Sequence, residues 1–108
     1  MRIFHIATAA DWRRAQQAGS YTTSTYGRTL RQEGFIHASR HDQVATVMER
    51  FYGDLREPLV LLEIDTDLLD VPWREEAVGD DTYPHIYGPL ATDAVALARP
   101  IDAGDPRG

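Results

Sequence analysis

Three histidines lie in short apolar segments of this chain, at positions where a buried strand more commonly carries Val or Ile. They are His5, His37 and His85, and each of them has an Ile neighbour. An imidazole titrates near neutral pH and can act as a general acid or base. A single such residue is more commonly a core histidine that bonds a backbone carbonyl. Three of them on separate strands predict a shared cleft in which all three are catalytic.

Tyr87 lies two positions after His85. We expect Tyr87 either to contact a ligand, by stacking or through its hydroxyl, or to be a core aromatic residue. Arg28 lies in the segment 20–29, which is rich in Ser, Thr and Tyr. That segment is interpreted as a surface loop, or as a ligand lid in which Arg28 contacts an anion.

Two carboxylates, Glu75 and Glu76, follow Trp73 in the sequence. An apolar neighbour raises the pKa of a carboxyl group, which would suit it for acid–base chemistry. The alternative is a pair of solvated side chains on an edge strand. The sequence leaves open whether either joins the site.

A three-histidine zinc site is the sharpest alternative use of the histidines. The spacing gives it little support, because a helix cap at Ser39 places His37 before the helix and His41 inside it. The chain also lacks an HExxH motif, so no metal is expected. Ser39 is explained by capping, and without a GxSxG elbow it is not predicted to be a nucleophile.

Composition excludes several classes of protein. The 108 residues include 17 acidic and 11 basic side chains, with a formal net charge of −6, and contain neither Cys nor Lys. Disulfides, thiolate metal sites and Schiff-base chemistry are therefore excluded. An acidic chain is not expected to bind nucleic acid, whereas Arg suits a small anionic ligand. The apolar residues 3–10 are too short for a signal or membrane segment, so we expect a cytoplasmic protein; the oligomeric state is not predicted.

Apolar spacing and turn residues predict an α+β domain with a mixed, mostly antiparallel sheet and two main helices. Strands are expected at 2–7, 35–38, 59–65, 71–77, 83–87 and 94–99, and helices at 9–17 and 40–52, with a helical turn at 29–33. Strand 59–65 is expected to be central and strand 71–77 to be an edge. Residues 1–100 form one domain, and the Gly- and Pro-rich residues 101–108 a flexible tail.

Two helix caps are predicted, Thr8 and Ser39, each followed by Asp at the third helical position. Gly19 is the predicted end of the first helix and Gly53 of the second. In the second helix, four apolar residues recur at helical spacing and are expected to form its buried face: Val44, Val47, Met48 and Phe51.

Several motifs together resemble a small bacterial family, catalogued as domain-of-unknown-function family 952. They are His5-Ile6-Ala7-Thr8, Gly34-Phe35-Ile36-His37-Ala38-Ser39, Phe51-Tyr52, Leu61-Leu62-Glu63-Ile64-Asp65 and Pro84-His85-Ile86-Tyr87-Gly88-Pro89-Leu90. The resemblance covers residues 5 to about 95. It implies an ADP-ribosyltransferase-like fold, in which a split sheet holds NAD in a central cleft.

The same resemblance implies roles for individual residues. His5 with Thr8 matches the first motif of that superfamily, and His37 with Ser39 matches the second. The third motif is usually acidic, and here His85-Ile86-Tyr87 stands in its place. A neutral imidazole does not supply the negative charge that stabilises an oxocarbenium-like transition state, so Glu75 or Glu76 would have to move in.

Three functions follow as hypotheses. The first is an enzyme that uses NAD, ADP-ribose or a related nucleotide: His5 and Thr8 hold the ribose side, His37 and Ser39 shape the nicotinamide pocket, and His85 acts as acid, base or phosphate ligand. The second is a non-catalytic binding module that retains the cleft, favoured by the missing acidic residue. The third is an interaction protein in which the histidines are structural. Membership of the superfamily is an analogy and does not by itself assign a reaction.

Overall fold

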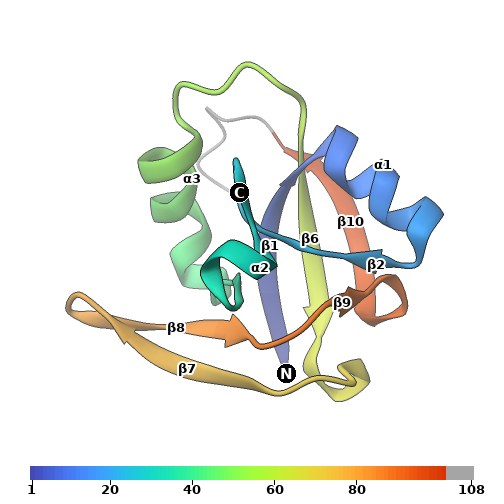
Figure 1. Ribbon diagram of the computed structural model, residues 1–108. Helices are drawn as coiled ribbons and strands as arrows, with labels where there is room; N and C mark the ends of the chain where they lie inside the picture. The colour runs from blue at the N-terminus through green and yellow to red at the C-terminus, as the bar shows by residue number, and fades with distance from the viewer. Residues whose placement is uncertain (102–108) are drawn as a thin grey trace.

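The central strand of the fold is β6 (Leu59–Asp65), as its apolar run predicts. The computed structural model describes residues 1–101. In it, β6 lies between β1 (Arg2–Thr8) and β10 (Val95–Ile101) and pairs antiparallel with both (Figure 1). The first and last strands of the described chain therefore flank β6, one on each side.

A second three-stranded sheet contains the other two histidine strands. Its order is β5 (Ile36–His37), β8 (Asp81–Ile86) and β7 (Trp73–Val78), again with antiparallel pairing. As predicted, β7 is an edge strand, and it forms a hairpin with β8. All strand pairings in residues 1–101 are antiparallel, which confirms an α+β domain of mostly antiparallel sheet. The prediction that the sheet is mixed is wrong for these residues, because each strand that follows a helix joins its neighbour in the opposite direction.

The two sheets meet at an isolated bridge between Phe4 of β1 and Ser39, just beyond β5. The Phe4 amide donates to the Ser39 carbonyl at 2.8 Å, and the Ser39 amide donates to the Phe4 carbonyl at 2.7 Å. Beyond this bridge, in the direction of His5, β1 remains paired with β6, and β5 is paired with β8. The sheets separate there, and side chains from both strands face the space between them.

The predicted start and end of the first helix, α1 (Ala9–Ala18), are confirmed. The Thr8 hydroxyl accepts a hydrogen bond from the Asp11 amide at 3.1 Å, and Gly19 ends the helix with a φ of 85°. The predicted helical turn is α2 (Leu30–Glu33), capped by Thr29. Gly34 follows with a φ of 87°, a left-handed conformation that turns the chain sharply into β5.

The predicted cap of the second main helix at Ser39 is wrong. A short 3-10 turn, η1 (His41–Gln43), precedes α3 (Val44–Tyr52), and the capping position belongs to Arg40, whose amide donates to the Gln43 side chain at 2.9 Å. The backbone of Ser39 pairs with Phe4 instead, and the helical turn begins beyond it at His41.

The buried face of α3 also differs from the predicted one. Val44, Met48 and Tyr52 are buried, whereas Phe51 is 59 % exposed. The predicted inclusion of Phe51 in the core is therefore wrong. Tyr52 replaces it, four residues after Met48 on the same helix face.

The segment predicted as a loop, 20–29, contains short strands. They are β2 (Ser20–Tyr21), β3 (Thr23–Thr25) and β4 (Arg28–Thr29); β3 pairs with β4, and β2 pairs with β9 (Leu90–Ala91). Two further 3-10 turns lie at η2 (Thr66–Leu68) and η3 (Thr92–Ala94). Short polar strands lack the apolar alternation from which a strand is predicted.

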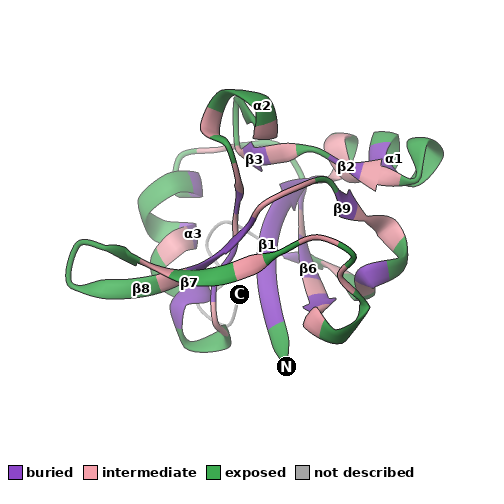
Figure 2. Ribbon diagram, turned by 60° about the horizontal axis from the view of Figure 1, so that its bottom comes forward, coloured by how far each residue is buried: buried purple, intermediate pink, exposed green. Residues whose placement is uncertain are grey.

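Two hydrophobic clusters lie on opposite faces of the sheet β1-β6-β10. On β1, Ile3 and Ala7 belong to the cluster beside α1, whereas Phe4 and Ile6 belong to the cluster beside α3. Every residue of β1 after Arg2 is buried (Figure 2). Ile101 still lies in β10, opposite Leu59, and the rest of the predicted tail, 102–108, lies outside the described residues. No helix in residues 1–101 has both the length and the apolar character needed to cross a membrane.

Candidate functional site

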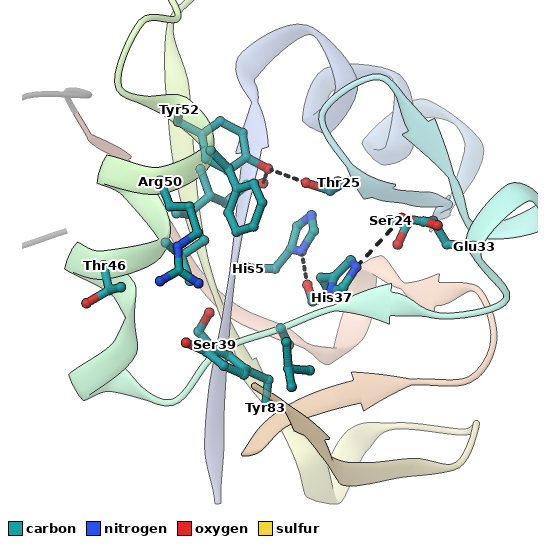
Figure 3. Close-up of a pocket in the computed structure, with 15 residues that line it drawn as sticks. His5, Ser24, Thr25, Glu33, His37, Ser39, Thr46, Arg50, Tyr52 and Tyr83 are labelled. Atoms are coloured by element: carbon teal, nitrogen blue, oxygen red, sulfur yellow. Dashed lines mark hydrogen bonds and ion pairs between the residues drawn. The ribbon is translucent and has the colours of Figure 1, made fainter. Parts of the chain in front are cut away.

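A cavity of about 170 Å³ lies where the two sheets separate, between β1, β3, β5 and α3. Figure 3 shows its lining, which comes from segments far apart in the sequence. Three of the predicted site residues line it: His5, His37 and Ser39. The cavity arises because β1 and β5 diverge on one side of the Phe4–Ser39 bridge.

His5 is buried, and both of its ring nitrogens are hydrogen-bonded. Nδ1 lies 2.5 Å from the His37 carbonyl, and because a carbonyl only accepts, Nδ1 carries the proton. Nε2 then accepts from the Tyr21 hydroxyl at 2.8 Å. Burial lowers the pKa of His5 to about 4, so the ring is neutral at physiological pH. His5 therefore orients β5 and Tyr21, and has no free nitrogen for a proton transfer.

His37 is half-buried, and its ring faces a carboxylate. Nε2 lies 3.7 Å from Oε1 of Glu33. Burial lowers the pKa of His37, and the negative charge of Glu33 opposes that effect in part. Glu33 reaches this position because α2 ends at Gly34, where the chain turns back along the cavity. A neutral imidazole beside a carboxylate is an arrangement suited to acid–base chemistry.

Glu33 is a cavity residue that was not predicted from the sequence. Glu33 is the acidic residue that lines the cavity, whereas Glu75 and Glu76 do not line it. Glu75 is bound by Arg40 at 2.9 Å, and Glu76 by Arg74 at 3.3 Å. The signal that was available is the spacing of four residues from Glu33 to His37 across a helix-ending glycine.

Hydroxyl groups line the inner end of the cavity. Ser24 is fully buried, and its Oγ has no hydrogen-bond partner within residues 1–101. The Thr25 hydroxyl lies 3.3 Å from that of Tyr52, which donates to the Ile6 carbonyl, also at 3.3 Å. An unpaired buried hydroxyl costs about 1–3 kcal/mol, so Ser24 would gain from a polar ligand atom.

The outer end of the cavity is formed mainly by α3 and the β7–β8 hairpin. Arg50 and Phe51 line it from α3, and Val78 and Tyr83 from the hairpin. Arg50 forms no ion pair with any residue in the described range. The sequence does not predict these four residues at the site, because their place there depends on how α3 and the hairpin, which are distant in the chain, pack together.

His85 does not line the cavity, although it lies close to His37. The two residues pair across β5 and β8, and their ring centroids are 5.4 Å apart. His85 stacks on Phe35 at 3.9 Å and is itself buried; its Nε2 has no partner within residues 1–101. Burial, and in second place the charge of His37, lower the pKa of His85. Its position is that of a packing residue behind His37.

The remaining predicted ligand contacts also lie outside the cavity lining. Thr8 is buried and caps α1. Arg28 is exposed and reaches Oε2 of Glu33 at 3.3 Å, so it contacts the site only through that carboxylate. Tyr87 is half-buried, and the Arg74 guanidinium lies 4.8 Å from its ring centroid.

No group of three or more His, Asp or Glu side chains within residues 1–101 is arranged to hold a metal ion. The cavity is lined by two imidazoles, one carboxylate, one guanidinium, several hydroxyl-bearing residues and apolar side chains. Such a combination suits an organic ligand with hydroxyl groups and a flat ring.

Comparisons with known proteins give a family and similar structures for the chain. Residues 6–98 match the family described as "Protein of unknown function (DUF952)". No curated protein matches the chain. The fold resembles the crystal structure of protein CC0527 from Caulobacter crescentus, with 28 % identity and a TM-score of 0.80 over 94 % of this chain and 87 % of that one. The solution NMR structure of CC0527 matches with 30 % identity and a TM-score of 0.70, over 94 % and 84 % of the two chains.

Proposed function

We propose that the cavity binds one end of NAD, ADP-ribose or a related nucleotide. The chain itself belongs to the DUF952 family of proteins of unknown function. The observation that carries the proposal concerns Ser24, a residue that lines the cavity and whose buried hydroxyl has no hydrogen-bond partner in the described chain. A hydroxyl or carbonyl group of the ligand would satisfy it.

The size of the cavity indicates which part of a nucleotide would enter. Pockets for drug-sized ligands span about 300–1,000 Å³, and this cavity has about 170 Å³. It therefore suits one ring or sugar of the ligand, with the rest lying outside. Ile6, Val47 and Phe51 would contact the faces of that group, while Ser24 and Glu33 would bind its polar edge.

The ADP-ribosyltransferase-like interpretation is part of this proposal. Two features support it: the sheets separate around a cavity, and His5 and His37 lie at that separation. The absence of an acidic residue at His85 remains a departure from the superfamily pattern. Glu33 would supply the missing negative charge from a different position in the chain.

In this proposal the reaction is transfer or hydrolysis at the ribose carbon that carries nicotinamide. His37 accepts the proton of the attacking hydroxyl or water. The bond from ribose to nicotinamide breaks, and its electron pair leaves with neutral nicotinamide. Glu33 stabilises the positive charge that develops on the ribose ring.

Calorimetry with NAD, ADP-ribose and nicotinamide tests the binding. Wild-type protein is expected to bind at least one of them at millimolar concentration or below. Ser24→Ala is expected to weaken that binding about 5- to 30-fold, the loss for one buried hydrogen bond. Ser20→Ala, the same change in β2 outside this cavity, is the matched control and should bind as wild type does. No heat with any of the three ligands would refute the proposal.

A second candidate function is binding without turnover. It is favoured by His5, whose ring nitrogens are both occupied by His37 and Tyr21. Chromatographic measurement of nicotinamide release from NAD separates the two functions. Release that is abolished in His37→Gln and in Glu33→Gln indicates an enzyme, and unchanged NAD bound to the wild type indicates a binding module.

A further inference from the structure

We infer that the ligand carries a phosphate group and that Arg50 binds it at the outer end of the cavity, together with the hydroxyl of Ser39. This inference rests on the proposed nucleotide function and deepens it by assigning the phosphate to one end of the site. Arg28, the anion contact expected from sequence, is occupied instead by Glu33.

Within residues 1–101, Arg50 is a cation without a counter-ion in an acidic chain. The chain has a formal net charge of −6, yet Arg50 forms no ion pair with any of residues 1–101. Arg13, Arg31 and Arg56 likewise have no ion pair within residues 1–101, but they do not line the cavity. Arg50 is also the basic residue that lines the cavity, so it would be the local attraction for an anion there.

Ser39 provides an independent observation at the same end. It is only 6 % exposed and lines the cavity. Its backbone is used by Phe4, but its side-chain hydroxyl forms no hydrogen bond with the described residues. Figure 3 shows the guanidinium of Arg50 extending along the cavity on the side where Ser39 and Tyr83 lie.

The helix geometry brings a further donor to this end. Thr46 and Arg50 are four residues apart on α3, and both line the cavity. Guanidinium and hydroxyl groups both donate hydrogen bonds to phosphate oxygens. Arg can form two parallel hydrogen bonds to one phosphate group.

Glu33 favours one orientation of the ligand. It lies beside His37, while the guanidinium of Arg50 extends towards Ser39 (Figure 3). A phosphate placed at Glu33 would be repelled, and sugar hydroxyls placed there would donate to the carboxylate. The nucleotide therefore enters with its sugar towards Glu33 and its phosphate towards α3.

The test compares AMP with adenosine and adds inorganic pyrophosphate as a probe without a base. By calorimetry, wild-type protein is expected to bind AMP at least about 10-fold more tightly than adenosine, the contribution of one charged hydrogen-bonded contact. In Arg50→Gln the two ligands are expected to bind equally. Arg13→Gln removes the same charge from an exposed position on α1 and should keep the preference of the wild type.

The outcomes separate this inference from the proposed function. If AMP retains its preference over adenosine in Arg50→Gln, the phosphate site is refuted while nucleotide binding stands. If no nucleotide binds but pyrophosphate shifts the amide resonances of Arg50 and Ser39, nucleotide binding is refuted and the anion site stands. Arg50 is exposed, so its replacement should not alter folding. Should Arg50→Gln unfold, Arg50→Lys keeps the charge and should show a weakened preference; an unchanged one refutes the inference.

Discussion

His5 and His37 have different roles although both line the same cavity. His5 is buried and neutral, with both nitrogens bonded, whereas His37 is half-buried beside Glu33. The environment of each ring, and not the residue type, decides which of the two can exchange a proton.

The burial of His5 predicts a loss of stability in acid. Its pKa is about 4 in the folded protein and about 6.5 in the unfolded chain. The unfolded chain therefore takes up a proton first as the pH falls. The contribution is fully present above pH 6.5 and is lost between about 6.5 and 4, by about 3 kcal/mol in the free energy of unfolding. Urea unfolding from pH 7.5 to 4.5 measures the loss, and an NMR titration of the His5 ring near pH 6.5 would contradict it.

Glu33 is expected to set the protonation of His37. Its negative charge raises the pKa of His37 against the effect of burial. Glu33→Gln removes that charge, so the pKa of His37 should fall further. NMR titration of the His37 ring measures the change, and Glu49→Gln, on the exposed side of α3, is the control. An unchanged or higher pKa in Glu33→Gln would show that the two side chains do not interact in solution.

At the residue scale, three residues that line the cavity were predicted as site residues from the sequence: His5, His37 and Ser39. Three others that line it were not predicted: Glu33, Ser24 and Arg50. The first three lie in apolar segments, where a polar residue is conspicuous. Arg50 lies among exposed helix residues, and Ser24 lies in a polar segment. Their role depends on which of their sides meets the cavity, and that is decided by contacts between distant segments.

At the scale of elements, the β7–β8 hairpin is held against η1 by a polar cluster. Arg40 donates to Glu75 and to the Thr82 carbonyl, both at 2.9 Å, and Gln43 donates to the same carbonyl at 2.7 Å. The hairpin contributes Val78 and Tyr83 to the cavity. This cluster therefore positions one wall of the site.

Gln43 is the buried member of that cluster, so its replacement should have the larger effect. Gln43→Ala is expected to destabilise the protein by about 1–2 kcal/mol, because it removes bonds to Thr82 and Asp81 in a buried position. Hydrogen exchange of the hairpin amides should accelerate more than that of β6. Gln16→Ala, an exposed glutamine of α1, is the control. Equal acceleration in hairpin and β6 would indicate global destabilisation instead.

The two main helices show what local sequence does and does not determine. The boundaries of α1 follow from Thr8 and Gly19 alone, since both act within a few residues. Those of α3 do not, because Ser39 pairs with Phe4, which is 35 positions earlier in the chain. The tertiary pairing with Phe4 therefore overrides the local pattern that assigns Ser39 to a helix cap.

At the scale of the whole molecule, the fold depends on β6 and the clusters on either side of it. Leu62 is fully buried in the cluster beside α1. Leu62→Ala should cost about 2–5 kcal/mol, a large share of the about 5–15 kcal/mol that stabilises a typical domain. Leu97→Ala, at a half-exposed position of β10, should cost much less. Urea unfolding measures both, and similar values for the two would contradict the central position of β6.

The α+β class, the central strand and the edge strand were predictable because they follow from apolar runs and from Pro72. The separation of the sheet into two parts was not predictable from these patterns. It depends on β1 and β5 meeting at Phe4 and Ser39 and diverging at His5, a matter of long-range pairing.

Because of that divergence, the melting temperature of the protein should report whether a ligand is bound in the cavity. A ligand bound between the two sheets would contact both, so unfolding would require its release. At a concentration 100 times its dissociation constant, such a ligand adds about 2.7 kcal/mol to the free energy of unfolding. Heating the protein alongside a panel of candidate metabolites would therefore rank them by the rise in melting temperature, with no reaction known beforehand.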